Sequence, residues 1–117
     1  MQVALLATIA SVATAATASP ISSQKATYYD ASIGIGACGK QLDESEMGVA
    51  VSTQMDCKAL CGKSVEINSN GNTVSAPVVD CCPGCDGNHI DVTPNIFDSL
   101  DIALSEGVAP VAFSIEE

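Results

Sequence analysis

The chain has 117 residues, with four lysines, no arginine and fourteen acidic residues, and its formal net charge is −10 at neutral pH. This charge repels phosphate backbones and anionic lipid surfaces, so we expect neutral or basic partners and neither a nucleic acid nor a membrane. The length allows one small domain.

The first 18 residues form an apolar stretch that contains no charged side chain and ends on Ala16-Thr17-Ala18. This stretch is too short to span a bilayer, and its small final side chains suit a signal peptidase, so we predict a signal peptide at residues 1–18. A membrane anchor or a core helix is the alternative, because no basic residue precedes the apolar run. Cleavage would leave a flexible leader at residues 19–24 and one extracellular, monomeric domain at residues 25–117.

All six cysteines follow the predicted cleavage site. An even number of cysteines in a small secreted chain indicates a disulfide framework, and it consists of Cys38, Cys57, Cys61, Cys81, Cys82 and Cys85. A zinc site that includes His89 is one alternative, but thiolate zinc sites belong mainly to reducing compartments. A redox site at Cys82-Pro83-Gly84-Cys85 is another, but a turn sequence follows where a helix N-terminus would be needed. We therefore expect disulfides, with no metal and no cofactor.

The first half of the domain contains short apolar runs. Residues 25–29 carry β-branched and aromatic side chains that favour a strand, which the glycines of residues 34–39 interrupt. Residues 48–52 form an apolar run of strand length, and residues 54–60 suit one helical turn.

The second half carries the clearest local signals. Two alternating runs at residues 64–68 and 73–79 flank Asn70-Gly71, which predicts a hairpin, and Pro77 indicates an edge or a bulge. Thr93-Pro94 is typical of a helix start and predicts one helix over residues 94–104. Residues 108–115 alternate as a closing strand, so the predicted fold is mainly β with one short helix.

Three segments together resemble the double-psi β-barrel family of expansins, fungal loosenins, barwin-like proteins and rare lipoprotein A domains. They are Ala26-Thr27-Tyr28-Tyr29 with Gly36-Ala37-Cys38-Gly39, then residues 78–85, then His89-Ile90-Asp91-Val92-Thr93-Pro94 and the residues to Phe97. The resemblance implies a six-stranded barrel with a shallow groove that binds polysaccharide.

The resemblance also assigns site residues. Asp91 matches the aspartate that is the general acid of related small endoglucanases and is needed for wall loosening in expansins. Ile90 and Val92 would supply the apolar setting that raises the pKa of such an acid. The alternative is that Asp91 only caps the following helix or ends a turn.

Four further residues complete the candidate groove. Asp80 matches a second groove acid, with an ordinary turn aspartate as its alternative. At most one of Tyr28 and Tyr29 should face the sugars, because strand neighbours point to opposite faces. His89 would orient Asp91, or it is a structural hydrogen-bond donor. Asp30 would be the catalytic base only if the protein hydrolyses glycans, and it is otherwise a loop aspartate.

Two features depart from the family pattern. Cys57 and Cys81 look like an added pair, which leaves Cys38 with Cys61 and Cys82 with Cys85 as the simplest pairing of the other four. The chain has no tryptophan, so the aromatic platform of expansins is missing. We predict a secreted protein that binds neutral wall polysaccharide and loosens it without hydrolysis. The alternatives are a glycoside hydrolase or lytic transglycosylase that uses Asp91, and an inhibitor of a secreted cysteine protease or an effector.

Overall fold

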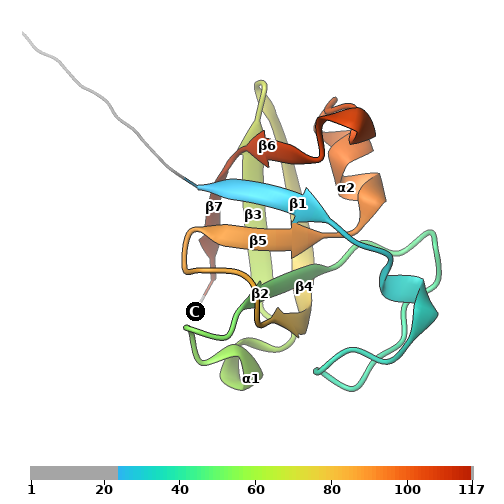
Figure 1. Cartoon of the computed structure of the whole chain (residues 1–117), viewed down its shortest axis with the longest axis vertical. Coiled ribbons are helices and arrows are strands. Elements are labelled where there is room, and N and C mark those ends of the chain that lie inside the picture. The colour runs from blue at the N-terminus through green and yellow to red at the C-terminus, as the bar shows by residue number, and fades with distance from the viewer. Residues whose placement is uncertain (1–23, 117) are drawn as a thin grey trace, which may run out of the picture.

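The computed structural model describes residues 24–116. The predicted signal peptide and residues 19–23 of the predicted leader lie outside the described residues. The described part contains seven strands and two short α-helices (Figure 1). They are β1 (Lys25–Tyr28), β2 (Val49–Ser52), α1 (Cys57–Leu60), β3 (Ser64–Ser69), β4 (Asn72–Cys82), β5 (His89–Val92), α2 (Pro94–Ser99), β6 (Val108–Pro110) and β7 (Ala112–Ile115). Two 3-10 turns lie at Ala31–Ile33 and Leu104–Glu106.

The strands form one sheet in the order β6-β1-β5-β2-β4-β3-β7, and its two ends belong to the same stretch of chain. β6 pairs with β1 and β7 pairs with β3, so residues 108–115 join both edges of the curled sheet. The family resemblance implied six strands, and residues 108–115 were predicted as one closing strand. The buried Val111 interrupts it, since its N–H donates to the Gln24 carbonyl rather than to a strand partner, and seven strands result.

Gln24 belongs to the barrel rather than to a flexible leader. Its side-chain amide donates to the Phe113 carbonyl at 3.2 Å and accepts from the Phe113 N–H at 2.9 Å. Its carbonyl also receives the Val111 N–H. The closing stretch is therefore fastened at Val111 and Phe113, just before the first residue of β1.

The β3–β4 hairpin is confirmed, and its turn explains the Asn-Gly pair. Asn70 and Gly71 both have positive φ, 55° and 78°, as a two-residue hairpin turn of this hand requires. The bulge expected near Pro77 is also present, because Val49 pairs with Val78 while Ala50 pairs with Asp80. Val79 is the extra residue. It turns Asp80 away from the core side, where strict alternation after the buried Val78 would have placed it.

Helix α2 is shorter than predicted. It ends at Ser99 rather than near residue 104, because Asp101 adopts a left-handed conformation with φ 61°. The turn allows the Ile102 N–H to bond to the Phe97 carbonyl and brings Ile102 into the core. The second helix, α1, lies within the predicted turn at residues 54–60.

Three disulfides tie the lower end of the barrel, and they are the predicted pairs Cys38–Cys61, Cys57–Cys81 and Cys82–Cys85. No cysteine in the described part is free, which removes the thiolates that a zinc site would need. Within residues 24–116, no helix is long and apolar enough to cross a membrane.

Candidate functional site

Five neighbouring strands place one residue each in a single row on the outer face of the barrel. Thr27 pairs with Val108 on one side and Asp91 on the other, Asp91 pairs with Ala50, and Ala50 pairs with Asp80. We call Thr27, Asp91, Ala50 and Asp80 the acid row. Strands lie about 4.8 Å apart, so the Cα atoms of Asp91 and Asp80 are about 10 Å apart across the methyl group of Ala50.

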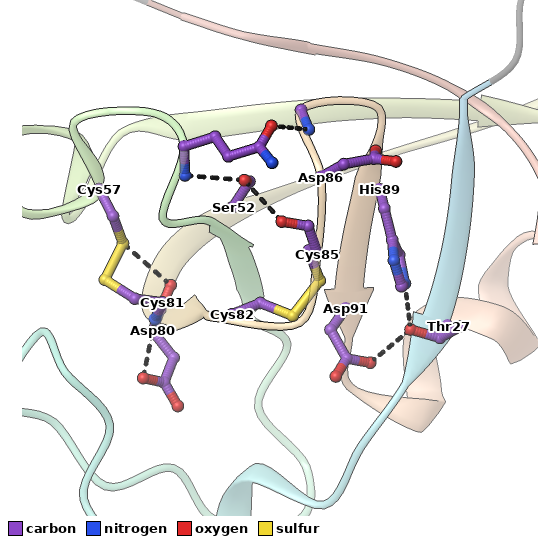
Figure 2. Close-up of a disulfide and its surroundings, with 12 residues drawn as sticks. Thr27, Ser52, Cys57, Asp80, Cys81, Cys82, Cys85, Asp86, His89 and Asp91 are labelled. Atoms are coloured by element: carbon purple, nitrogen blue, oxygen red, sulfur yellow. Dashed lines mark hydrogen bonds between the residues drawn. A yellow bond between two sulfur atoms is a disulfide. The ribbon is translucent and has the colours of Figure 1, made fainter.

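Asp91 is held by a hydrogen-bond chain that starts at His89 (Figure 2). The Thr27 hydroxyl donates to Asp91 Oδ1 at 2.9 Å, and its oxygen lies 2.8 Å from His89 Nε2. Because a hydroxyl has only one hydrogen, the bond to an ionised Asp91 requires His89 Nε2 to be the donor to Thr27. The Thr27 hydroxyl thus lies between His89 and Asp91, and the two do not bond directly.

The pKa of the Asp91 carboxyl is raised. Its partial burial is the main cause, and the charge of Asp80 acts in the same direction, against the Thr27 hydrogen bond and His89. The prediction that Ile90 and Val92 supply the apolar surroundings of this carboxyl is wrong, however. Ile90 and Val92 point to the opposite face of β5, where both side chains are fully buried in the core. The raised pKa thus comes from the outer face and not from these two side chains.

Asp91 does not cap helix α2. Thr93 is the N-cap residue, and its hydroxyl accepts from the Gly48 N–H at 3.1 Å and donates to Asn95 Oδ1 at 2.6 Å. The capping alternative for Asp91 is therefore wrong, since its recorded side-chain partner is Thr27.

Asp80 anchors the loop that follows β1. Its Oδ1 atom accepts from the backbone N–H groups of Ala37 at 2.7 Å and Cys81 at 2.8 Å. Gly36 permits this approach, because a Cβ there would lie 2.6 Å from the Val79 carbonyl oxygen. Asp80 is thus a structural anchor whose carboxyl also belongs to the acid row.

The two tyrosines point in different directions. The Tyr28 ring packs edge-on against Phe97 with centroids 5.1 Å apart, and its hydroxyl donates to the Leu104 carbonyl at 2.9 Å. The Tyr29 hydroxyl is buried and has no hydrogen-bond partner within residues 24–116. Burial raises the Tyr29 pKa far above its usual range, and the charges of Asp80 and Asp91 add to the effect. Tyr29 therefore keeps its proton and is a donor without an acceptor.

Asp30 lies outside the acid row, at the start of the 3-10 turn Ala31–Ile33. Its Oδ1 accepts from the Ser32 N–H at 2.9 Å and from the Ser32 hydroxyl at 2.5 Å, and these bonds lower the Asp30 pKa. The exposed Asp30 also borders a hollow of about 240 Å³ that Tyr29, Asp80 and residues 33–36 help to line.

Sequence reasoning missed Thr27 and Ala50 as members of the site. Thr27 was visible only as a strand residue and Ala50 as part of an apolar run, and both join the row through pairings between distant segments. Within the described part of the chain, no cluster of three or more His, Cys, Asp or Glu side chains is arranged to hold a metal ion.

The family model DPBB_1, described as lytic transglycolase, matches residues 21–113. The chain belongs to the RlpA-like double-psi β-barrel family. The resemblance deduced from the three sequence segments is thereby confirmed.

Curated relatives of this double-psi barrel have different names. The papain inhibitor of Streptomyces mobaraensis is 38% identical over 84 residues, which are 65% of this chain and 58% of that protein. An Asp f 7 allergen homologue of Arthroderma benhamiae is 39% identical over 80 residues, 63% of this chain but only 27% of the relative. Ripening-related protein 3 of Oryza sativa subsp. japonica is 31% identical over 106 residues, 75% of this chain and 50% of that protein. The chain thus spans between about a quarter and somewhat over half of these relatives.

Two solved double-psi barrels match 80% of the chain. The Streptomyces papain inhibitor superposes with a TM-score of 0.67 at 36% identity and is covered over 91% of its length. A point mutant of the Clavibacter michiganensis expansin, solved in complex with cellohexaose, superposes with a TM-score of 0.71 at 26% identity and is covered over 49%. The first is a protease inhibitor by name, and the second binds a glucan oligomer.

Proposed function

We propose that this protein is secreted and binds neutral cell-wall polysaccharide along the acid row. The observation that carries the proposal is the placement of the Asp91 and Asp80 carboxyls in one row on the outer face, on either side of Ala50. Sugar hydroxyls donate hydrogen bonds, so two carboxylate acceptors suit them. The likeness to an expansin solved with cellohexaose supports the same ligand class.

Ala50 is only 3% exposed, so the partly exposed carboxyls of Asp91 and Asp80 are the groups of the row that a ligand would reach. Ala50 lies between the two carboxyl-bearing residues, where a larger side chain would stand between Asp91 and Asp80. A polysaccharide strand that crosses the row would meet the carboxyls of Asp91 and Asp80 in turn, with the buried Ala50 between them. Tyr28 is outside this proposed contact, because its ring and hydroxyl already pack within the protein.

We propose that binding loosens the polysaccharide network without cleaving it. Asp91 has the raised pKa of an acid, but Asp30, the base that an inverting mechanism would need, has a lowered pKa and is engaged by Ser32. A low pKa makes a carboxylate a weak proton acceptor. The protein would therefore compete for hydroxyl contacts between glycans rather than activate water.

The test is binding and loosening by Asp91→Asn, which keeps the shape of the side chain and its acceptor for Thr27. We expect weaker retention on insoluble cellulose and mixed-linkage glucan and less extension of wall strips under load. Asp101→Asn is the matched control, because Asp101 is exposed and asparagine tolerates its left-handed conformation. Equal binding and loosening by Asp91→Asn and the parent would refute the acid row as the site.

A second candidate function is inhibition of a papain-type cysteine protease. It is favoured by the papain inhibitor, which is 36% identical in the structural superposition and is covered over 91% of its length. Titration of papain with the purified protein tests it, and full protease activity at a large excess of this protein would exclude it.

A further inference from the structure

The most exposed large apolar side chains of the described part lie together on one loop. Ile33 is 82% exposed and Ile35 is 71% exposed, whereas Val108 is 52% and Leu104 is 37% exposed. Single exposed apolar side chains are common on protein surfaces, but two that flank one glycine make a continuous apolar feature. We call Ile33, Gly34 and Ile35 the apolar tip. It lies in the segment between β1 and β2, which stands away from the barrel in Figure 1.

The loop that carries the tip is restrained on both sides. On the N-terminal side, Asp30 binds the N–H and hydroxyl of Ser32, and the Gln41 amide donates to the Ser32 carbonyl at 2.9 Å. On the C-terminal side, the Gly36 N–H donates to the Lys40 carbonyl at 3.1 Å, and Asp80 holds the Ala37 N–H. The Cys38–Cys61 disulfide then ties the loop to the end of α1. A restrained loop loses little conformational entropy when it binds.

The backbone of the tip leaves the 3-10 turn at Ile33 and becomes extended at Gly34. Gly34 is fully extended, with φ and ψ both −178°, and no atom lies within 4 Å of the position that a Cβ would occupy. The backbone at Gly34 is therefore open to a partner, and the flanking isoleucine side chains are exposed and free to enter pockets of that partner. Isoleucine is branched rather than planar, so it suits an apolar pocket better than the flat face of a sugar ring.

The charges around the tip limit the possible partners. Asp30, Asp43 and Glu44 are exposed on the same loop segment, and the neighbouring Lys40 is paired with Glu46 at 3.0 Å. A second copy of this chain would bring the same acids against them, so self-association through the tip is disfavoured.

We infer that the apolar tip is the segment of this protein that enters the substrate cleft of a papain-type cysteine protease, with Ile33 and Ile35 as the apolar anchors. The inference rests on the inhibitory function proposed above. It assigns the protease contact to the Ile33–Ile35 loop and leaves the acid row to polysaccharide, and the two sites adjoin at the hollow that Ile33, Ile35 and Asp80 help to line.

The test compares inhibition constants against papain for the parent and for Ile33→Thr/Ile35→Thr. Threonine keeps the β-branched shape but removes apolar area. Because both positions are exposed, we expect the variant to fold like the parent, and circular dichroism checks this. We expect the inhibition constant to rise roughly tenfold or more, as for loss of central apolar anchors. Val108→Thr is the matched control for an exposed β-branched side chain elsewhere, and it should inhibit like the parent. Amide exchange at residues 32–36 should slow in the complex.

The outcomes separate the loop from the function. If the parent inhibits papain and the tip variant inhibits equally well, the assignment of the tip is overturned and the inhibitory function stands. If the parent leaves papain fully active, both are overturned and the polysaccharide proposal is unaffected. If the tip variant loses cellulose retention but still inhibits papain, the tip belongs to the sugar site and the inference is wrong.

Discussion

At the residue scale, different contacts hold the two aspartates of the acid row in place. Asp91 depends on Thr27, which lies 64 positions away in the sequence and becomes its neighbour through the parallel β1–β5 pairing. Asp80 depends on the bulge at Val79 and on the close approach that Gly36 allows. The motif containing Asp91 was visible in the sequence, but a parallel pairing between distant segments leaves no local pattern that would have identified Thr27.

The raised pKa of Asp91 predicts a pH-dependent cost in stability. Because the Asp91 pKa in the folded protein lies above the ordinary aspartate value of 3.8, the favourable contribution of Asp91 is fully present below about pH 4. It is lost as the pH rises through the folded-state pKa and the half-buried carboxyl ionises. We expect Asp91→Asn, which cannot ionise, to melt at a higher temperature than the parent at pH 7 and at the same temperature near pH 3.

Thermal unfolding between pH 3 and 7 measures this difference, with Asp101→Asn as the control for loss of one surface charge. An advantage of Asp91→Asn that is largest at pH 3 would contradict the raised pKa. Higher stability with loss of binding is a common trade at functional sites.

Thr27→Val tests the hydrogen-bond chain from His89 to Asp91. Valine has nearly the same shape but cannot donate, and the Thr27 hydrogen bond lowers the Asp91 pKa. We therefore expect the Asp91 pKa, measured by carbon-13 NMR titration, to rise further in Thr27→Val, together with weaker polysaccharide binding. Thr27→Ser should restore both, and an unchanged pKa in Thr27→Val would show that the hydroxyl does not hold the carboxylate.

At the scale of elements, sequence patterns predicted the structure best where the contacting residues are close in sequence. The hairpin turn at Asn70 and Gly71 follows from two residues that accept positive φ. The end of α2 was misplaced because Asp101 takes a left-handed conformation and the burial of Ile102 pulls the chain back, and neither is visible in the helical pattern. The split of the closing strand at Val111 was missed for the same reason, since its partner, Gln24, is remote in sequence.

The Cys57–Cys81 disulfide fixes helix α1 to the end of β4, directly beside Asp80. It closes a loop of 24 residues, and loop-closure entropy gives such a crosslink about 3 kcal/mol. We expect Cys57→Ser/Cys81→Ser to lower the melting temperature by roughly 10–20 °C in a domain of this size. Polysaccharide binding should weaken too, because the register of Asp80 loses its anchor.

Calorimetry and a cellulose pull-down at 20 °C measure the two effects of removing this disulfide. Lys58→Ala is a control for the exposed surface of the same helix. A double serine variant with unchanged melting temperature would mean that barrel packing alone holds this end of the molecule.

At the scale of the whole molecule, the acidic charge and the closed barrel point to a rigid scaffold with binding surfaces on its outside. Without β6 and β7, the other five strands would leave β1 and β3 as open edges of the sheet. Residues 108–115 pair with both of these edges. The curled sheet leaves only the short strands β6 and β7 as its edges, and short edge strands are poor templates for pairing with another chain. The site therefore lies across the strands on the outer face rather than in an interior cavity.

The same architecture predicts that the protein lacks hydrolytic turnover. Glycosidases gain several kcal/mol from distorting a sugar ring and from contacts that tighten in the transition state. An acid row on an outer face, without tryptophan, offers few contacts for such distortion. We expect no increase in soluble sugars or reducing ends after prolonged incubation with cellulose, mixed-linkage glucan, chitin or peptidoglycan.

Two aspartate variants give this experiment a sharp result in either direction. Products that form with the parent and disappear with Asp91→Ala would overturn the non-hydrolytic proposal. An inverting hydrolase would then also require a base to activate water, so Asp30→Ala should be inactive as well. If Asp30→Ala stays active while Asp91→Ala does not, a single acid is sufficient, and anhydro-sugar products from peptidoglycan would identify a lytic transglycosylase. The lowered pKa of Asp30 and its bonds to Ser32 favour the absence of hydrolysis. We therefore expect the parent, Asp30→Ala and Asp91→Ala all to release no soluble products.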